Sequence, residues 1–278
     1  TRPRQCRLKM RKASSGSKNV TANNIVPASL TPPVIILVRP QMGENIGAAA
    51  RAMMNCGIFE LRLVNPRDGW PNMAAVPMAA GGAEIIENTQ VFESLAEAAH
   101  DITFLAALSA RRRDMPIRNA EPRQAVGEIL AQTGRSAMMF GPEASGLDND
   151  EVVQADCLVT APLNPDYPSL NLAQAVLLMA WEWRVAALQS PQNAGGDAGE
   201  GAASEPPATI LERDHFHQRL EDELDHGGFF ISGEMAPTVK RNLRALFARA
   251  VPSSQELRTL HGVIQALTKN RTSNNSKS

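Results

Sequence analysis

Asn45 and Arg51 stand six residues apart, directly after an apolar run over 34–38 that predicts a buried parallel strand. Gly47 lies between them, in a turn that is expected to open a helix. A parallel strand followed by such a turn and a helix start is where α/β proteins place binding sites. A guanidinium at that edge can orient an oxygen atom and stabilise negative charge that develops on it. Small residues at a tight turn also serve packing alone, so this segment indicates a site only together with others.

Two later segments also follow predicted strands. Residues 140–147 read Phe-Gly-Pro-Glu-Ala-Ser-Gly-Leu, and residues 168–173 read Pro-Ser-Leu-Asn-Leu-Ala. They contribute Glu143, Ser169 and Asn171. Because ligands bind outside the carboxyl ends of parallel strands, we expect these side chains to lie at the same edge of the sheet as Arg51.

The three segments together resemble the signature motifs of the SpoU/TrmH branch of the SPOUT superfamily of RNA methyltransferases. Those motifs are Asn-x-Gly-x-x-x-Arg, Phe-Gly-x-Glu-x-x-Gly-Leu and Pro…Ser-Leu-Asn-(Val/Leu), and all occur here in that order, within about residues 33–188. The Asn-Pro-Asp-Tyr approach to the third motif and the region after residue 209 look most like the TrmJ group. That group methylates the ribose 2′-hydroxyl in the tRNA anticodon loop. The resemblance implies S-adenosylmethionine as the methyl donor.

The resemblance gives catalytic positions to Arg51, Asn45, Ser169 and Glu143. A guanidinium stays protonated, so we expect Arg51 to hold the hydroxyl or its phosphate and to stabilise alkoxide charge. The final proton acceptor stays open between Arg51, an RNA phosphate and water. Asn45 is expected to fix the turn, Ser169 to lie beside the methyl transfer, and Glu143 to line the pocket near the subunit interface. The ordinary alternatives are a solvated helix arginine for Arg51, turn chemistry for Asn45, a helix N-cap for Ser169 and a dipole-favoured charge for Glu143.

Loops after three predicted strands are expected to form the pocket for S-adenosylmethionine. Backbone groups of closely approaching loops can recognise adenine, which is flat and apolar with polar edges. The expected cofactor-binding residues are Leu108, Ser109, Ala110, Gly141, Glu143, Ala161, Leu163, Ser169, Leu170 and Asn171. Leu108 departs from the Thr that is usual in TrmJ-like chains, and Pro142 stands where they often have Arg.

Basic residues gather locally although the formal net charge is −1. Residues 1–30 carry seven Lys/Arg and no acid, which leaves 21 basic against 29 acidic residues elsewhere. This segment is typical of a disordered extension, such as an overlong start before Met10, or of a basic arm for RNA. The expected RNA-binding residues are Arg111, Arg112 and Arg113 at the lip of the pocket and Lys240, Arg241 and Arg244 in a C-terminal helix. Charge runs are also typical of solvated surfaces.

Short apolar strands that alternate with amphipathic helices predict an α/β fold, with a parallel sheet and helices on both faces. We expect strands at 34–38, 60–64, 102–107, 137–140 and 158–161, and helices at 47–56, 92–99, 123–132, 148–155 and 172–188. The resemblance adds a C-terminal trefoil knot, a feature that is otherwise rare.

The expected organisation has five parts. They are a basic disordered extension (1–30), a SPOUT methyltransferase domain (31–189), a flexible Gly/Ala/Pro/Ser-rich linker (190–208), a small all-helical RNA-binding domain (209–271) and a disordered tail (272–278). Within the helical domain we expect helices at 211–225, 238–250 and 253–267, the last opening with a capping box of Ser253 and Glu256.

Composition excludes several classes of protein. No run approaches the ~20 apolar residues of a membrane span. Cys6, Cys56 and Cys157 are widely spaced and form no CxxC, which argues against a disulfide framework and fits a reducing cytosol. The five histidines form no i, i+4 pair, so we expect no metal site. The chain has neither a Walker A loop nor GxGxxG.

We therefore expect a cytoplasmic enzyme that methylates a tRNA ribose 2′-hydroxyl as a homodimer, without membrane or metal. The dimer is implied by the resemblance. Residues 176–181 are apolar nearly all round, which fits a helix buried by its own domain and by a partner, although a plain core helix has the same pattern. Two alternatives stay open: a ribosomal RNA 2′-O-methyltransferase of the same branch, and a catalytically silent RNA-binding module that retains the fold.

Overall fold

The computed structural model describes Val26 and residues 30–110, 113, 115–190, 207–230, 233 and 235–275. Apart from Val26, Leu30 and residues 190, 207 and 208, the expected extension and linker lie outside the described residues, as do Arg111 and Arg112. The described part forms a seven-stranded sheet of order β3-β2-β1-β6-β4-β7-β5, in which every pair of neighbours is parallel. The strands are β1 (Val34–Val38), β2 (Leu61–Val64), β3 (Gln90–Phe92), β4 (Phe104–Leu108), β5 (Asn119–Ala120), β6 (Ser136–Phe140) and β7 (Cys157–Val159).

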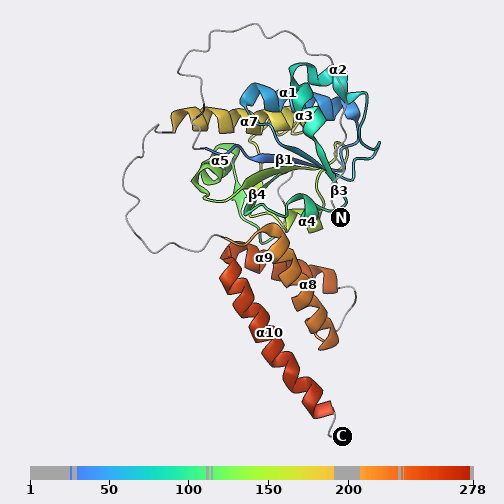
Figure 1. The fold of residues 1–278 in the computed structure, drawn as a ribbon, viewed down its shortest axis with the longest axis vertical. Coiled ribbons are helices and arrows are strands. Elements are labelled where there is room, and N and C mark those ends of the chain that lie inside the picture. The colour runs from blue at the N-terminus through green and yellow to red at the C-terminus, as the bar shows by residue number, and fades with distance from the viewer. Residues whose placement is uncertain are drawn as a thin grey trace.

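Helices cover both faces of this sheet, as predicted (Figure 1). Successive residues of β1 alternate between two cores: Ile35 and Leu37 face one, while Val34, Ile36 and Val38 face the other. The first core is shared with α1 (Gly43–Cys56), α2 (Ala75–Ala79), α3 (Ala83–Asn88), α5 (Pro122–Ala131) and α7 (Leu172–Gln189). The second is shared with α4 (Leu95–Ala98) and α6 (Asn149–Val152). A 3-10 turn, η2 (Ala80–Gly82), joins α2 to α3.

The five expected strands are present, with bounds shifted by at most two residues. The helix expected at 92–99 is wrong at its start, because Phe92 belongs to β3 and pairs with Val64. There the helix begins only after Ser94, whose hydroxyl accepts a hydrogen bond from Glu97 N. The helix expected at 148–155 ends early, at Val152. Strands β3 and β5 and helices α2 and α3 were not predicted.

Three helices, α8 (Ile210–His226), α9 (Ala236–Ala250) and α10 (Ser254–Asn275), lie together at one end of the molecule (Figure 1). Hydrogen bonds between Ser253 and Glu256 form the predicted capping box at the start of α10. This helix continues to Asn275, so the tail expected from residue 272 begins inside a helix. Ala208, Phe216 of α8, and Leu257 and Ile264 of α10 form a small core, and Phe247 of α9 packs against it.

The first turn of α8 is anchored on the sheet. Ile210 belongs to the second core of the sheet, and its N–H donates to Ile102 O at 2.8 Å. Arg213 pairs with Asp156 at 2.7 Å, with both side chains buried. The α8–α10 helices are therefore docked on the sheet through α8.

His217 lies one turn after this anchor and is buried. Burial lowers the pKa of His217 to about 3, and the nearby charges of Arg244 and Arg213 act in the same direction. The imidazole is therefore neutral in the folded protein at physiological pH.

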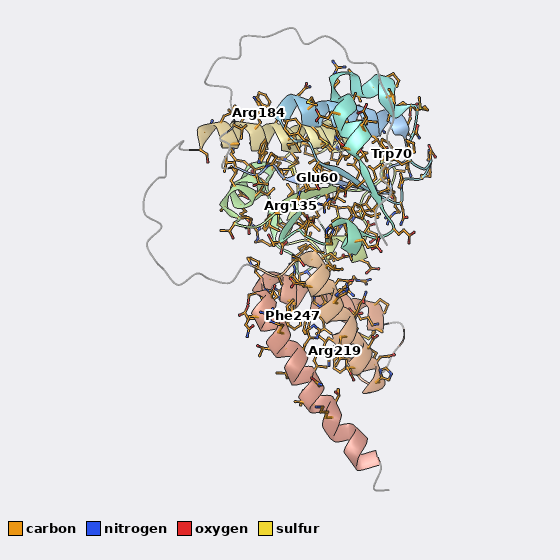
Figure 2. The ribbon with its side chains drawn as sticks, in the orientation of Figure 1. Glu60, Trp70, Arg135, Arg184, Arg219 and Phe247 are labelled. Carbon is orange, nitrogen blue, oxygen red and sulfur yellow. The ribbon has the colours of Figure 1, made fainter. Side chains whose placement is uncertain are left out.

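A cluster of charged side chains around the buried Arg62 lies at the amino ends of the strands. Arg62 is 2% exposed and bonds both Glu60 and Asp101 at 2.6 Å, and Arg135 pairs with the same two carboxylates. Glu60 and Arg135 lie close together in Figure 2. Burial opposes ionisation of Asp101, but the hydrogen bonds and charge of Arg62 outweigh it and lower the pKa of Asp101 to about 2. The cluster lies at the edge of the sheet opposite the predicted site.

Candidate active site

A pocket of about 260 Å³ opens at the carboxyl ends of β4, β6 and β7. It is built by the loops that follow these strands and by the start of α7. The lining residues are Leu108, Ser109, Ala110, Arg113, Phe140, Gly141, Pro142, Glu143, Ala144, Ser145, Gly146, Ala161, Leu163, Pro168, Ser169, Leu170, Leu172 and Ala175. Nine of the ten expected cofactor-binding residues are among them, and Asn171 is the exception.

Gly141 allows the middle loop of the pocket to close on itself. A Cβ atom at this position would lie 2.2 Å from Leu147 N, a distance that no side chain can occupy. The loop is also held by a hydrogen bond from Gly146 N to Pro142 O at 2.8 Å. The glycine thus permits the tight turn that places Glu143 and Ser145 on the pocket wall.

One residue from each motif joins a continuous hydrogen-bonded chain beside the pocket. Asn45 Nδ2 donates to Glu143 Oε1 at 2.7 Å, and Asn171 Nδ2 donates to Asn45 Oδ1 at 3.0 Å. Asn45 therefore bridges two loops that come from distant parts of the sequence. The structure thus brings together Asn45, Glu143 and Asn171, one residue of each motif.

Glu143 also binds the backbone just before α1. Its carboxylate accepts hydrogen bonds from Gln41 N at 2.8 Å and from Met42 N at 3.4 Å. Met42 is the N-cap residue of α1, but its side chain accepts no hydrogen bond from the first turn of the helix. A negative charge at a helix N-terminus is favourable, so Glu143 stabilises the start of α1 rather than the helix that follows it in sequence.

Arg51 lies on the second half of α1, with an exposed side chain, and is not among the residues that line the pocket. Gly47, one turn earlier on the same helix, packs directly against the backbone of α2. A Cβ at this position would lie 2.1 Å from Ala75 O. Gly47 therefore lets α2 contact α1 directly, and the motif glycine serves packing in this chain.

Asn171, rather than Ser169, is the N-cap of α7. Its side chain accepts from Ala173 N at 2.9 Å, and Gln174 completes a capping box. The alternative that Ser169 caps this helix is therefore wrong. Ser169 is exposed and lines the pocket, two residues before the cap.

Several expected RNA-binding cations have partners within the chain. Arg113 lines the pocket and donates to Leu147 O and Asn149 Oδ1. Arg244 binds Glu221 at 2.7 Å and Asp214 at 2.8 Å on α8. Lys240 lies 3.6 Å from Glu221, and Arg241 lies 3.4 Å from Asp150. The predicted patch on α9 is thus partly neutralised by carboxylates.

Arg39 contributes to the site without having been predicted. It follows β1 with a positive φ of 46°, and its guanidinium pairs with Asp148 and Glu151 at the start of α6. These pairs attach the loop before α1 to the segment after the Glu143 loop. No local sequence pattern indicates such a pairing.

Among the residues that the structure describes, no cluster of His, Cys, Asp or Glu has the makeup of a metal site. None of their helices is both long and apolar enough to cross a membrane.

Comparisons with known proteins agree with this geometry. Residues 32–181 match the SpoU rRNA Methylase family. The chain is 37% identical over 237 residues to the tRNA (cytidine/uridine-2'-O-)-methyltransferase TrmJ of Yersinia enterocolitica, a match that covers 84% of this chain and 91% of that protein. The crystal structure of TrmJ from Z. mobilis aligns with a TM-score of 0.77 at 43% identity, over 86% of this chain and all of that one. A probable methylase family protein from Haemophilus influenzae aligns with a TM-score of 0.54 at 32% identity, over 87% and 98% of the two chains. This chain belongs to the SpoU rRNA Methylase family.

Proposed function

We propose that this protein uses S-adenosylmethionine to methylate a ribose 2′-hydroxyl of tRNA, in the anticodon loop, within the cytoplasm. The observation that carries the proposal is the hydrogen-bonded meeting of all three motifs beside one pocket. The similarity to TrmJ over most of both chains supports tRNA as the substrate. Ribosomal RNA is the second candidate, favoured by the name of the matching family.

The residues that line the pocket suit S-adenosylmethionine in their chemistry. Leu108, Leu163 and Leu170 would offer apolar contacts to an adenine ring, and backbone groups of the loops at Ser109 and Gly141 would recognise its edges. Gly141 lets this loop turn tightly enough to form the wall, because a Cβ there would meet the backbone of Gly146 and Leu147. When bound, S-adenosylmethionine supplies an electrophilic methyl group.

The chain's own residues orient the attacking hydroxyl. Arg51 stays protonated and holds the ribose hydroxyl or its phosphate, and it stabilises negative charge that develops on the oxygen. Ser169 lies on the pocket wall, where it would be beside the bound methyl donor. Asn45 and Glu143 act as positioning residues, since their hydrogen bonds fix the start of the helix that carries Arg51.

The proposal includes a homodimer and a C-terminal trefoil knot. Leu177 and Trp181 lie one turn apart on α7 and are 44% and 56% exposed, which supports a partner that covers this face. Support for the knot is that the segment between β7 and α7 lines the same pocket as the loop at 141–147. In such a dimer the exposed Arg51 completes an active site at the interface.

The RNA-binding part of the proposal rests on the loop at Arg113 and on the helices α8–α10, taken as a helical domain that begins near residue 209. The helix α9 carries four cations and no acid, which favours contact with phosphates. Lys240 and Arg241 remain the best candidates of the predicted set, because their carboxylate contacts are long and partly solvated.

The test is Arg51→Ala in a methyl-transfer assay with labelled S-adenosylmethionine and bulk tRNA. We expect the rate to fall about 10²-fold or more, as for the loss of one preorganised donor at an oxyanion. Cofactor binding measured by calorimetry should not change. Arg123→Ala serves as the control, since that side chain is 82% exposed on α5. Turnover of Arg51→Ala close to the wild-type rate would remove Arg51 from the mechanism.

A further inference from the structure

Helix α9 has two faces with different surroundings. The face toward α8 carries Arg244 and Lys240, whose charges are met by Glu221, with Asp214 as a second partner of Arg244. Phe247 also packs there, against Phe216 at 4.8 Å between ring centroids. This face holds the three helices together, and most of its charge is used within the protein.

The opposite face of α9 borders an open groove of about 610 Å³. Its α9 residues recur at helical spacing and form one stripe along the helix. They are Val239, Asn242, Leu243, Leu246 and Arg249. Met115 and Pro116, from the loop after β4, form the other wall. Leu246 is 51% exposed, so among the residues that the structure describes none covers the apolar surface that it presents to the groove.

The groove adjoins the proposed active site through a single segment of chain. Met115 and Pro116 lie two and three residues after Arg113, which lines the cofactor pocket. Arg249 Nη1 donates to Pro116 O at 2.9 Å and so ties α9 to that segment. An RNA strand bound at the pocket would therefore have its neighbouring nucleotides close to this groove.

The chemistry of the groove suits an unpaired nucleotide. Apolar side chains contact the face of a base, an amide such as that of Asn242 can bond a base edge, and a guanidinium can bind phosphate. Arg249 is paired with a carbonyl and with no carboxylate among the described residues, so its charge is available. The volume falls within the ~300–1,000 Å³ of typical small-molecule sites.

We propose that this groove holds an unpaired nucleotide of the substrate RNA close to the one that is methylated. The inference rests on the proposed function. It assigns RNA contact to Asn242, Leu246 and Arg249, on the face of α9 that lies opposite the internally paired Arg244. A second copy of the chain would be the competing occupant of an apolar groove, and the test separates the two.

The experiment uses the full-length variants Leu246→Glu and Arg249→Gln. Their controls are Leu267→Glu, at a leucine that is 69% exposed on α10, and Arg123→Gln on α5. Methyl transfer to bulk tRNA gives KM and kcat, filter binding gives Kd for tRNA over a range of salt concentrations, and calorimetry with S-adenosylmethionine checks the fold. Light scattering reports the molecular mass of each variant.

We expect both groove variants to raise KM and Kd for tRNA about tenfold, the effect of losing one base or phosphate contact, with kcat and cofactor affinity unchanged. Arg249→Gln should also reduce the slope of log Kd against log salt by about 1. Wild-type KM, Kd and salt slope in both variants would overturn the proposal, as would a change in mass without a change in Kd. Wild-type protein that transfers no label to tRNA would instead refute the proposed function, and direct binding would still test the groove.

Discussion

Replacing Glu143 by alanine should loosen the start of α1 and slow methyl transfer together. The carboxylate accepts two short hydrogen bonds, from Gln41 N at 2.8 Å and Asn45 Nδ2 at 2.7 Å, and a longer one from Met42 N. Hydrogen bonds to a charged group contribute about 1.5–3 kcal/mol each, and water reaches this partly buried site. Taking the lower value for the two short bonds, the free energy of unfolding should fall by about 3 kcal/mol.

A double-mutant cycle with Asn45→Ala tests whether the effect comes from this geometry. Asn45→Ala removes one of the two short bonds, so the double variant should lose less than the sum of the single losses, by about 1.5 kcal/mol. Urea unfolding followed by tryptophan fluorescence gives these values, and the labelled assay on the same samples gives the rates.

Glu87→Ala, at an exposed glutamate on α3, is the matched control and should change stability by no more than about 0.5 kcal/mol. Strictly additive losses from Glu143→Ala and Asn45→Ala would refute the hydrogen-bonded chain as the element that positions α1. A slow enzyme of unchanged stability would instead give Glu143 a direct role in catalysis.

Three further perturbations follow from the structure. Gly47→Ala places a Cβ against Ala75 O and should lower the free energy of unfolding by about 1–3 kcal/mol. Gly127→Ala, in open space on α5, should raise it by about 0.5–1 kcal/mol. Urea unfolding compares the two variants, and equal effects would contradict the packing argument. Because the pKa of His217 is lowered to about 3 in the folded state, the unfolded chain binds a proton that the folded one does not between pH 6.5 and 3. Stability should therefore fall as the pH drops through that window, and His217→Gln should flatten the fall; an unchanged pH profile of unfolding would argue against a neutral buried imidazole. Trp181→Glu should shift the molecular mass measured by light scattering from dimer to monomer, and a wild-type mass would exclude this face of α7 as the interface.

Local patterns were enough to predict the sheet and most of the pocket. Apolar runs of four to six residues marked five strands, and binding loops follow the carboxyl ends of parallel strands as a rule of this fold class. Nine of the ten residues that we expected to bind the cofactor therefore line one pocket. The strands β3 and β5, of three and two residues, are too short to show a period of two, and Phe92 matched a helical pattern equally well.

Contacts between distant residues could not be predicted in this way. The bond between Asn45 and Glu143 joins residues 98 positions apart, and the bond to Asn171 spans 126. The partners of Arg244 lie on a neighbouring helix, so its charge looked available in the sequence alone. The same holds for Arg39, whose pairs with α6 depend on the fold of the whole edge.

The most direct test of the account is methyl transfer from labelled S-adenosylmethionine to bulk tRNA and, separately, to ribosomal RNA, each taken from a strain that lacks this protein. Digestion of the RNA to nucleosides and mass spectrometry then locate the methyl group. The account predicts label on a ribose 2′-oxygen of tRNA, and none in ribosomal RNA. Label confined to ribosomal RNA would contradict the substrate, and no label in either RNA, despite measurable cofactor binding, would contradict the reaction itself.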